Sequence, residues 1–275
     1  MQHHDTDRAE APAASLTPEQ VEAFRRDGYL VLGRITTDEE MDRLRDTYDR
    51  LFEERAGEGG GMYFDLAGPR GHDGRDVLPQ ILAPEQHAPE LRDTQYFRNA
   101  RRIAAALLGV DEAEVTGGGH MILKPPRYGR ETPWHQDEAY WPPENEYRSV
   151  SVWLPLDEAS VESGCMCFVP GSHRAPVRRH RHIDDDPTVH GLVTDDVDPE
   201  SAVACPIPAG AATVHHARTL HYAGPNTTDR PRRAYILVMN APRIPAAHPD
   251  DRPWLREEQE AAAAGGGSAM GQGTE

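Results

Sequence analysis

The chain has 275 residues, a formal net charge of −17 at pH 7 and a hydrophobic content of 37%. This length suits one large domain or two small ones, and it is sufficient to bury a full core. The negative charge argues against nucleic acid or an anionic membrane surface as a partner, because both are bound by basic faces. The charge is consistent with solubility alone, or with a cationic substrate.

The two ends of the chain and its cysteines predict a cytoplasmic protein with loose termini. Residues 1–15 are polar and lack the basic and then apolar segments of a secretory signal, so we expect a disordered tail. No run of about 18 apolar residues occurs, which predicts no transmembrane helix. Three cysteines are too few for a disulfide framework. Residues 251–275, which end in AAAAGGGSAMGQGTE, are predicted to form a low-complexity tail.

Helices are predicted in the first 110 residues, within residues 17–28, 36–58 and 91–110. Apolar side chains recur at helical spacing in these segments, and Gly28 and Gly109 mark helix ends. The first two segments open with a threonine followed three residues later by Gln or Glu, which is the capping-box pattern. The pairs are Thr17 with Gln20, and Thr37 with Glu40.

From residue 112 onward, short segments with β character alternate with Pro and Gly turns. They are HMILK, RSVSVWLPL, CMCFVPG, ATVHHA, TLHYAG and RAYILVMN. This succession is typical of an all-β barrel or a double-sheet jelly roll. We therefore predict a mostly β fold with flanking helices: a double-stranded β-helix (jelly roll) core with an N-terminal helical layer, in one domain over residues 16–250.

The motif H-x-D can present an imidazole and a carboxylate to one space, because residues i and i+2 of a strand share a face. It occurs at His3/Asp5, His135/Asp137, His182/Asp184 and His248/Asp250. The first pair lies in the tail, and the last two lie in charged or Pro-rich loops. Only His135 and Asp137, in TPWHQDEAYW, enter a β-rich region with bulky neighbours, so they are the candidate metal-binding pair.

A third ligand must come from elsewhere, because two donors hold a catalytic metal poorly. Histidine, carboxylate and a distant histidine form the facial triad of non-haem Fe(II) oxygenases, which leaves three coordination positions open. The candidates for the third ligand are His215, His216 and His221, in TVHHARTLHYAGPN.

Several motifs, in this order, resemble those of the phytanoyl-CoA dioxygenase family of Fe(II)/2-oxoglutarate oxygenases. They are FRRDGYLVL near the start, ILKPP, WHQDEAYW, VPGSHR and LHYAGPNTTDRPRR, so the resemblance spans about residues 17–240. It implies that His135, Asp137 and His221 bind Fe(II), and that Arg232 binds the far carboxylate of the co-substrate 2-oxoglutarate.

The resemblance also implies that Trp153 and His120 lie beside 2-oxoglutarate, although His120 stands where the family has Met. Ala223 replaces a Ser that often helps to hold 2-oxoglutarate, and Ala211 replaces an acidic residue of a Gly-Asp turn. The presence of Asp137 argues against halogenation, because related halogenases have a small residue there.

The strand pattern around Arg232 agrees with an anionic partner. Arg232 shares a strand face with Ala234, Ile236 and Val238, and a lone guanidinium on an apolar face requires a compensating anion such as a carboxylate. The alternatives are a surface position for Arg232 and a plain core position for Trp153.

We therefore expect an oxygenase that uses Fe(II), 2-oxoglutarate and O2 to oxidise an unactivated C–H bond of a small molecule. A secondary metabolite that is cationic or sugar-like fits the acidic chain better than an acyl-CoA does. Two alternatives stay open: a cupin-like protein that binds metal without turnover, and a zinc hydrolase.

Overall fold

The computed structural model describes residues 15–68 and 74–264. Its helices are α1 (Pro18–Asp27), α2 (Asp38–Glu53), α3 (Gln95–Leu108) and α4 (Pro253–Ala264). Its strands are β1 (Tyr29–Arg34), β2 (Tyr63–Asp65), β3 (Pro79–Leu82), β4 (Thr116–Lys124), β5 (Thr132–His135), β6 (Asn145–Glu146), β7 (Ser149–Pro155), β8 (Met166–Phe168), β9 (Arg181–His182), β10 (Leu192–Val193), β11 (Val203–Cys205), β12 (Ala211–His216), β13 (His221–Ala223), β14 (Arg232–Asn240) and β15 (Ile244–Pro245). Within these residues, no helix is long and apolar enough to span a bilayer.

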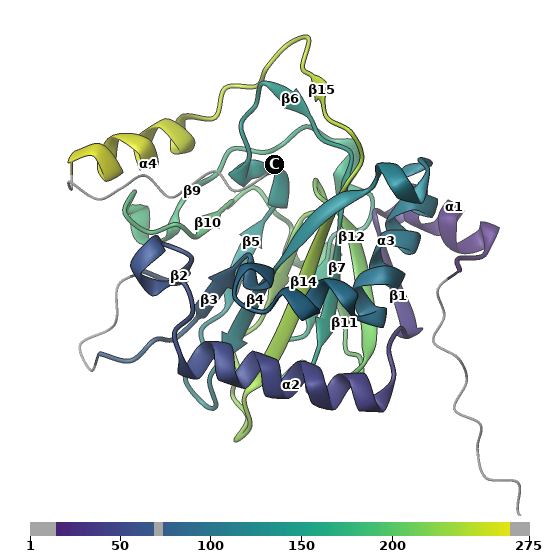
Figure 1. The fold of residues 1–275 in the computed structure, drawn as a ribbon. Coiled ribbons are helices and arrows are strands. Elements are labelled where there is room, and N and C mark those ends of the chain that lie inside the picture. Colours follow the sequence, from purple (N-terminus) through teal and green to yellow (C-terminus); the bar gives the residue numbers. More distant parts are fainter. Residues whose placement is uncertain (1–14, 69–73, 265–275) are drawn as a thin grey trace, which may run out of the picture.

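Two antiparallel sheets form the centre of the molecule (Figure 1). The large sheet has seven strands in the order β1-β12-β7-β14-β4-β3-β2, and the small sheet has four in the order β11-β8-β13-β5. Apolar side chains of both sheets, including Trp153 and Ile236 of the large sheet and Phe168 of the small sheet, meet in one buried cluster between them. This arrangement confirms the predicted jelly roll with flanking helices.

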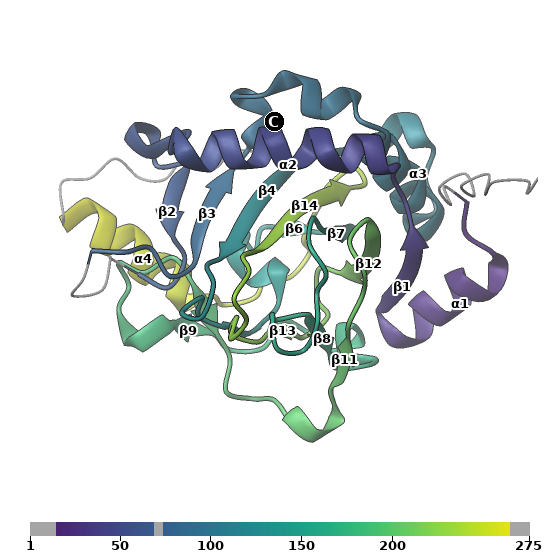
Figure 2. The same ribbon diagram turned by 90° about the horizontal axis from the view of Figure 1, so that it is seen from below.

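The outer face of the large sheet is covered by α2 and α3, and Figure 2 shows α2 lying across its strands. Alternation along β14 separates the two faces of the sheet, since Tyr235, Leu237 and Met239 belong to the helix-side cluster. Ala234 and Ile236 belong to the cluster between the sheets. The helical layer therefore buries one apolar face and leaves the other face of the same strands free to line a site.

The two predicted capping boxes differ in the structure. At α1 the box is complete, because Thr17 Oγ1 accepts from the Gln20 amide at 3.2 Å and the Thr17 amide donates to Gln20 Oε1 at 2.8 Å. At α2 only half of it forms: Thr37 Oγ1 accepts from the Glu40 amide at 3.2 Å, but the Glu40 side chain does not return to Thr37. The predicted capping box at α2 is therefore wrong for the bond from the Thr37 amide to the Glu40 side chain.

Glu40 instead binds the start of α3. Its carboxylate accepts from the backbone amides of Gln95 at 2.6 Å and Tyr96 at 2.8 Å, and from the Thr36 hydroxyl at 2.5 Å. A carboxylate is favoured there because the first amides of a helix are otherwise unpaired and carry a partial positive charge. Glu40 thereby joins α2 to α3 across the helical layer.

The prediction of a low-complexity tail over residues 251–275 is wrong for residues 253–264, which form α4. Trp254 is buried, and its indole Nε1 donates to Ala139 O at 2.8 Å. A buried aromatic anchor outweighs the low sequence complexity that follows it. The predicted tail over residues 1–15 and the end of the chain from residue 265 lie almost wholly outside the described residues, and the single domain over residues 16–250 stays a prediction.

Replacing Glu40 with Ala is expected to lower the free energy of unfolding by about 2–4 kcal/mol, because two buried donors and one half-buried donor lose their acceptor. Urea unfolding followed by circular dichroism measures this change. Glu39→Ala is the matched control on the exposed side of the same turn, with an expected change within about 0.5 kcal/mol. Equal effects of the two substitutions would contradict the role assigned to Glu40.

Candidate active site

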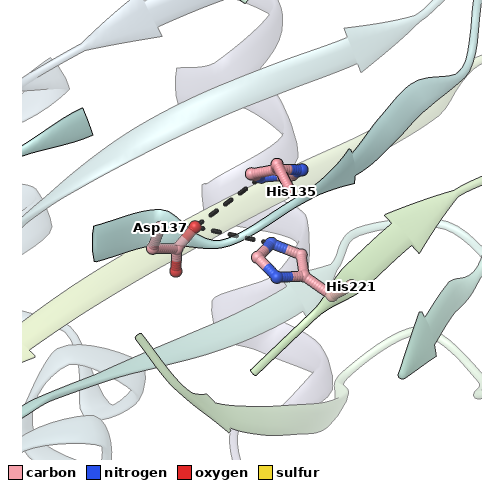
Figure 3. Close-up of side chains that lie close together, drawn as sticks. All are labelled: His135, Asp137 and His221. Atoms are coloured by element: carbon pink, nitrogen blue, oxygen red, sulfur yellow. Dashed lines mark ion pairs between the residues drawn. The ribbon is translucent and has the colours of Figure 1, made fainter. Parts of the chain in front are cut away.

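A cross-strand pair of histidines lies on β13 and on the edge strand β5 of the small sheet. His221 on β13 is the direct register partner of His135 on β5, and their ring centroids are 4.1 Å apart. Asp137 begins the 3-10 turn that follows β5, and its carboxylate points at both rings (Figure 3). Two strands that are distant in sequence thus bring the three predicted side chains together.

The donor atoms of these three residues have the spacing of a metal site. Nε2 of His135 lies 3.7 Å and Nε2 of His221 lies 3.4 Å from Asp137 Oδ1, and one ligand atom from each of the three lies within 4.8 Å of the others. Because metal–nitrogen bonds are about 2 Å long, one ion can reach all three donors. The residues present therefore fit a metal ion.

Backbone carbonyls fix which nitrogen of each histidine is free. His135 Nδ1 donates to Pro133 O at 2.8 Å, and His221 Nδ1 donates to Thr219 O at 2.9 Å. A carbonyl can only accept, so in the neutral form that binds a metal the proton of each ring is on Nδ1, and the Nε2 lone pair faces Asp137. Orientation of a ligating imidazole through its other nitrogen is the usual arrangement at metal sites.

The strand assumption behind the H-x-D argument is wrong in detail. β5 ends at His135, and Asp137 belongs to a 3-10 turn rather than to the same strand. Gln136 between them keeps an extended backbone, with φ −125° and ψ 132°, so the alternation still brings both side chains to one side. The Gln136 side chain is buried and donates to Arg218 O at 2.7 Å, which anchors this turn.

Electrostatics favours the charge states that bind a cation. Burial opposes ionisation of Asp137, but the neighbouring His221 and a hydrogen bond from His215 hold the pKa of this carboxyl well below its usual range. Burial, reinforced by His221, lowers the pKa of His135 well below its usual value. An ionised carboxylate beside a neutral imidazole is the form that a metal ligand requires.

Arg232 lies at the inner end of the same cavity with its charge uncompensated. It is 1% exposed, and its Nε and Nη1 have no hydrogen-bond partner among the described residues. The guanidinium carbon is 5.4 Å from the Trp153 ring, and burial lowers the pKa of Arg232 to about 10. By contrast, the adjacent buried Lys124 donates to two carbonyl oxygens, those of Arg130 and Ala223. Arg232 therefore carries a buried positive charge that a bound anion would neutralise.

One cavity of about 1150 Å³ connects these groups. Its inner part contains the three clustered residues together with Arg232, Trp153 and His120, and burial lowers the pKa of His120 to about 4. Its outer part is lined by the chain after Asp137, by the segment around His190 and by α4. The six predicted site residues are thus brought to a single cavity.

The other H-x-D histidines within the described residues lie apart from this cavity. Both ring nitrogens of His182 are hydrogen-bonded to carbonyls, those of Val189 and Trp254, which makes it a structural residue. His248 is exposed, and His3 with Asp5 lies outside the described residues. Of the three candidate third ligands, His221 joins the cluster, whereas His216 accepts from the Arg218 amide.

Comparison with known proteins agrees with this geometry. The sequence profile of the phytanoyl-CoA dioxygenase (PhyH) family matches residues 24–234. The chain belongs to this family. It is therefore a member of the Fe(II)- and 2-oxoglutarate-dependent dioxygenases, as the resemblance of its motifs implied.

Relatives of this PhyH-family chain include enzymes of natural-product biosynthesis. EvdO2 from Micromonospora carbonacea var. aurantiaca, crystallised with 2-oxoglutarate, is 50% identical, with a TM-score of 0.78 over 88% of this chain and 97% of that one. SnoK, a carbocyclase from nogalamycin biosynthesis, is 25% identical, with a TM-score of 0.65 over 84% and 87% of the two chains. A probable hypophosphite dioxygenase of Stutzerimonas stutzeri is 35% identical, but the match spans only 42% of this chain and 41% of that protein.

Sequence reasoning missed the contribution of the C-terminal segment, which lies beyond the family match. Arg252 is buried, and its Nη1 donates to Glu138 O at 2.5 Å and to Trp141 O at 2.6 Å. Glu138, fully buried beside Asp137, also pairs with Arg218 at 2.8 Å. The sequence did contain a signal for this segment. A charged residue, Arg252, and a large aromatic residue, Trp254, precede the low-complexity residues.

Proposed function

We propose that His135, Asp137 and His221 hold Fe(II), and that Arg232 pairs with the distal carboxylate of 2-oxoglutarate. The clustered donor atoms support the first assignment, and the two unpartnered nitrogens of a buried guanidinium support the second. A guanidinium can grip a carboxylate through two parallel hydrogen bonds, which would satisfy those nitrogens. Trp153 and His120 would border the co-substrate between these two ends.

The iron, with 2-oxoglutarate and O2, supplies the oxidising power for an otherwise unreactive C–H bond. The co-substrate leaves as succinate and CO2, with one oxygen atom of O2 in succinate and the other available to oxidise the substrate. The contribution of this chain is to bind both molecules and to hold the reacting bond beside the buried residues of the cavity.

The substrate that we propose is a small molecule of secondary metabolism, sugar-like or cationic, which is hydroxylated, desaturated or closed into a ring. A cavity of about 1150 Å³ exceeds the usual size of a small-molecule pocket, so it has room for 2-oxoglutarate and a sizeable substrate together. The natural-product relatives support this class.

Charge in the outer cavity supports a neutral or cationic substrate rather than an acyl-CoA. Glu144 and Glu258 line it, and His190 Nδ1 donates to Glu258 Oε1 at 2.7 Å. The arginines there already have partners: Arg252 pairs with Glu138 at 3.3 Å, and Arg256 pairs with Asp251 at 2.7 Å. A phosphate-bearing substrate would thus meet carboxylates instead of free cations.

The first test is the release of succinate from 2-oxoglutarate. We expect release that requires Fe(II) and air, and that stops under argon. His221→Ala is expected to weaken Fe(II) binding by at least about 100-fold, because one of three protein ligands is removed, whereas His216→Gln is expected to retain it. Metal binding without any succinate would indicate a binding protein, and zinc-dependent activity indifferent to O2 would indicate a hydrolase.

Arg232→Met is expected to weaken 2-oxoglutarate binding by about 100-fold while leaving the affinity for Fe(II) unchanged. The ligand-free variant should be at least as stable as the wild type, since a buried unpaired charge is removed. Calorimetric titration of 2-oxoglutarate and thermal unfolding measure the two effects. The exposed Arg230→Met serves as the control, and an unchanged affinity for 2-oxoglutarate would refute this role of Arg232.

Amine-bearing saccharides are expected to stimulate succinate release more strongly than their N-acetylated counterparts, because the outer cavity carries carboxylates. Glu258→Gln is expected to reduce that preference by about fivefold, corresponding to about 1 kcal/mol for a partly exposed charge. Glu257→Gln, on the exposed side of α4, is the matched control. Equal stimulation by both forms of each saccharide would rule out recognition of a cationic group and leave a neutral substrate.

A further inference from the structure

We propose that Ser151 and His215 form a clamp that restricts Asp137 to binding the metal through one oxygen, and so keeps a coordination position free for the co-substrate. This inference rests on the proposed function, because it concerns the carboxylate assigned there to iron. It gives a positioning role to Ser151 and to His215, which the sequence offered only as a candidate for the third ligand.

The two oxygens of Asp137 have different surroundings. Oδ2 accepts from the Ser151 hydroxyl at 2.6 Å and lies 3.1 Å from His215 Nε2. Oδ1 faces the other way, toward Nε2 of His135 at 3.7 Å and of His221 at 3.4 Å. One oxygen is therefore committed to protein donors, and the other is directed at the space between the two ligating imidazoles.

The clamp comes from the large sheet, whereas the ligands come from the small sheet and its following turn. Ser151 on β7 and His215 on β12 are direct register partners, so their side chains stand next to each other on the inner face. Both are buried, at 1% and 2% exposure. Asp137 is thus held by a rigid pair of neighbouring strands.

His215 is arranged to donate rather than to accept. An ionised carboxylate oxygen can only accept, so the proton that His215 shares with Asp137 lies on Nε2. Its Nδ1 has no hydrogen-bond partner among the described residues. A buried ring nitrogen left without a partner carries a free-energy cost, and the hydrogen bond to Asp137 is the interaction that His215 gains at this position.

The number of coordination positions on the metal explains why a single Asp137 oxygen should bind it. Fe(II) has about six positions, of which two imidazoles and one carboxylate oxygen occupy three and leave three open. A keto acid that chelates takes two of them and O2 takes the last. If Asp137 bound through both oxygens, a fourth position would be filled and the co-substrate and O2 would compete for the remaining two.

The test compares two dissociation constants in the full-length protein: that of Co(II), as a stable substitute for Fe(II), and that of 2-oxoglutarate for the Co(II)-loaded protein. The variants are Ser151→Ala, His215→Phe and the double variant, with His215→Gln retaining a donor. His216→Gln, the next residue of β12, is the matched control. Thermal unfolding of each variant establishes that it is folded.

In the double variant we expect 2-oxoglutarate to bind about tenfold or more weakly, a change of about 1.4 kcal/mol or more. Co(II) should bind as tightly as in the wild type or more tightly, because the freed oxygen becomes an extra ligand, whereas loss of a residue that only orients a ligand usually lowers metal affinity. The visible absorption of bound Co(II) should change, because a carboxylate oxygen takes the place of a solvent ligand. His215→Gln should recover much of the 2-oxoglutarate affinity. If the double variant does not fold, Ser151→Ala alone should also bind 2-oxoglutarate more weakly without binding Co(II) more weakly, with a smaller change in the affinity for 2-oxoglutarate.

A clamp that only stabilises the turn would lower both affinities together, and that result would overturn the proposal. An unchanged affinity for 2-oxoglutarate in the double variant would overturn it as well. Failure of the proposed function is distinguishable, because the wild type itself would then bind neither Co(II) at this site nor 2-oxoglutarate.

Discussion

The pairing of β13 with β5 is the constraint on which the site depends. It places His221 opposite His135 on one rung of an antiparallel ladder. Side chains alternate along a strand, so a slip of one residue would turn one imidazole to the opposite face of the small sheet. The same pairing aligns the turn that starts at Asp137, because β5 runs directly into it. The geometry of the three donor atoms is thus a consequence of backbone register.

The large sheet contributes a different kind of group. Its outer face is apolar and covered by α2 and α3, while its inner face carries Ser151, His215 and Arg232. Polar groups on a buried face cost free energy wherever partners do not compensate them. The helical layer permits this division, since it stabilises the strands through their outer face. The proposed metal ligands on one sheet and its following turn then meet the polar groups of the other sheet in the cavity between them.

Much of the site could be predicted from the sequence, because its parts are local patterns in a fixed order. His135 and Asp137 are two residues apart, and His221 precedes a G-P-N turn. Their convergence was not readable from spacing, which left three histidines as candidates for the third ligand. The resemblance to the family selected His221, and the β13–β5 register supplies the physical reason.

The features that escaped prediction depend on tertiary contacts. Thr37 and Glu40 satisfy a local capping pattern, but the amides at the start of α3 offer the carboxylate two donors in place of one. α4 follows from burial of Trp254 against the turn after Asp137, which no periodicity in an Ala-rich segment reveals. In both cases a partner more than about 50 residues away decides the outcome, and local propensity gives only a weak prior.

In the proposed function, Arg232 links folding to co-substrate binding. Removing a guanidinium from water without a partner costs several kcal/mol, and effective protein dielectric constants reduce this cost without abolishing it. The rest of the fold therefore maintains an unfavourable charge at the inner end of the cavity, next to Lys124, whose ammonium is already bound by carbonyls. Under the proposed function, a dicarboxylate would compensate that charge at one end, and its keto-acid end would be free to face residues 135, 137 and 221. The proposal therefore predicts selectivity for a diacid over a monoacid from the position of one unpaired cation, and a ligand that binds only the folded protein stabilises it.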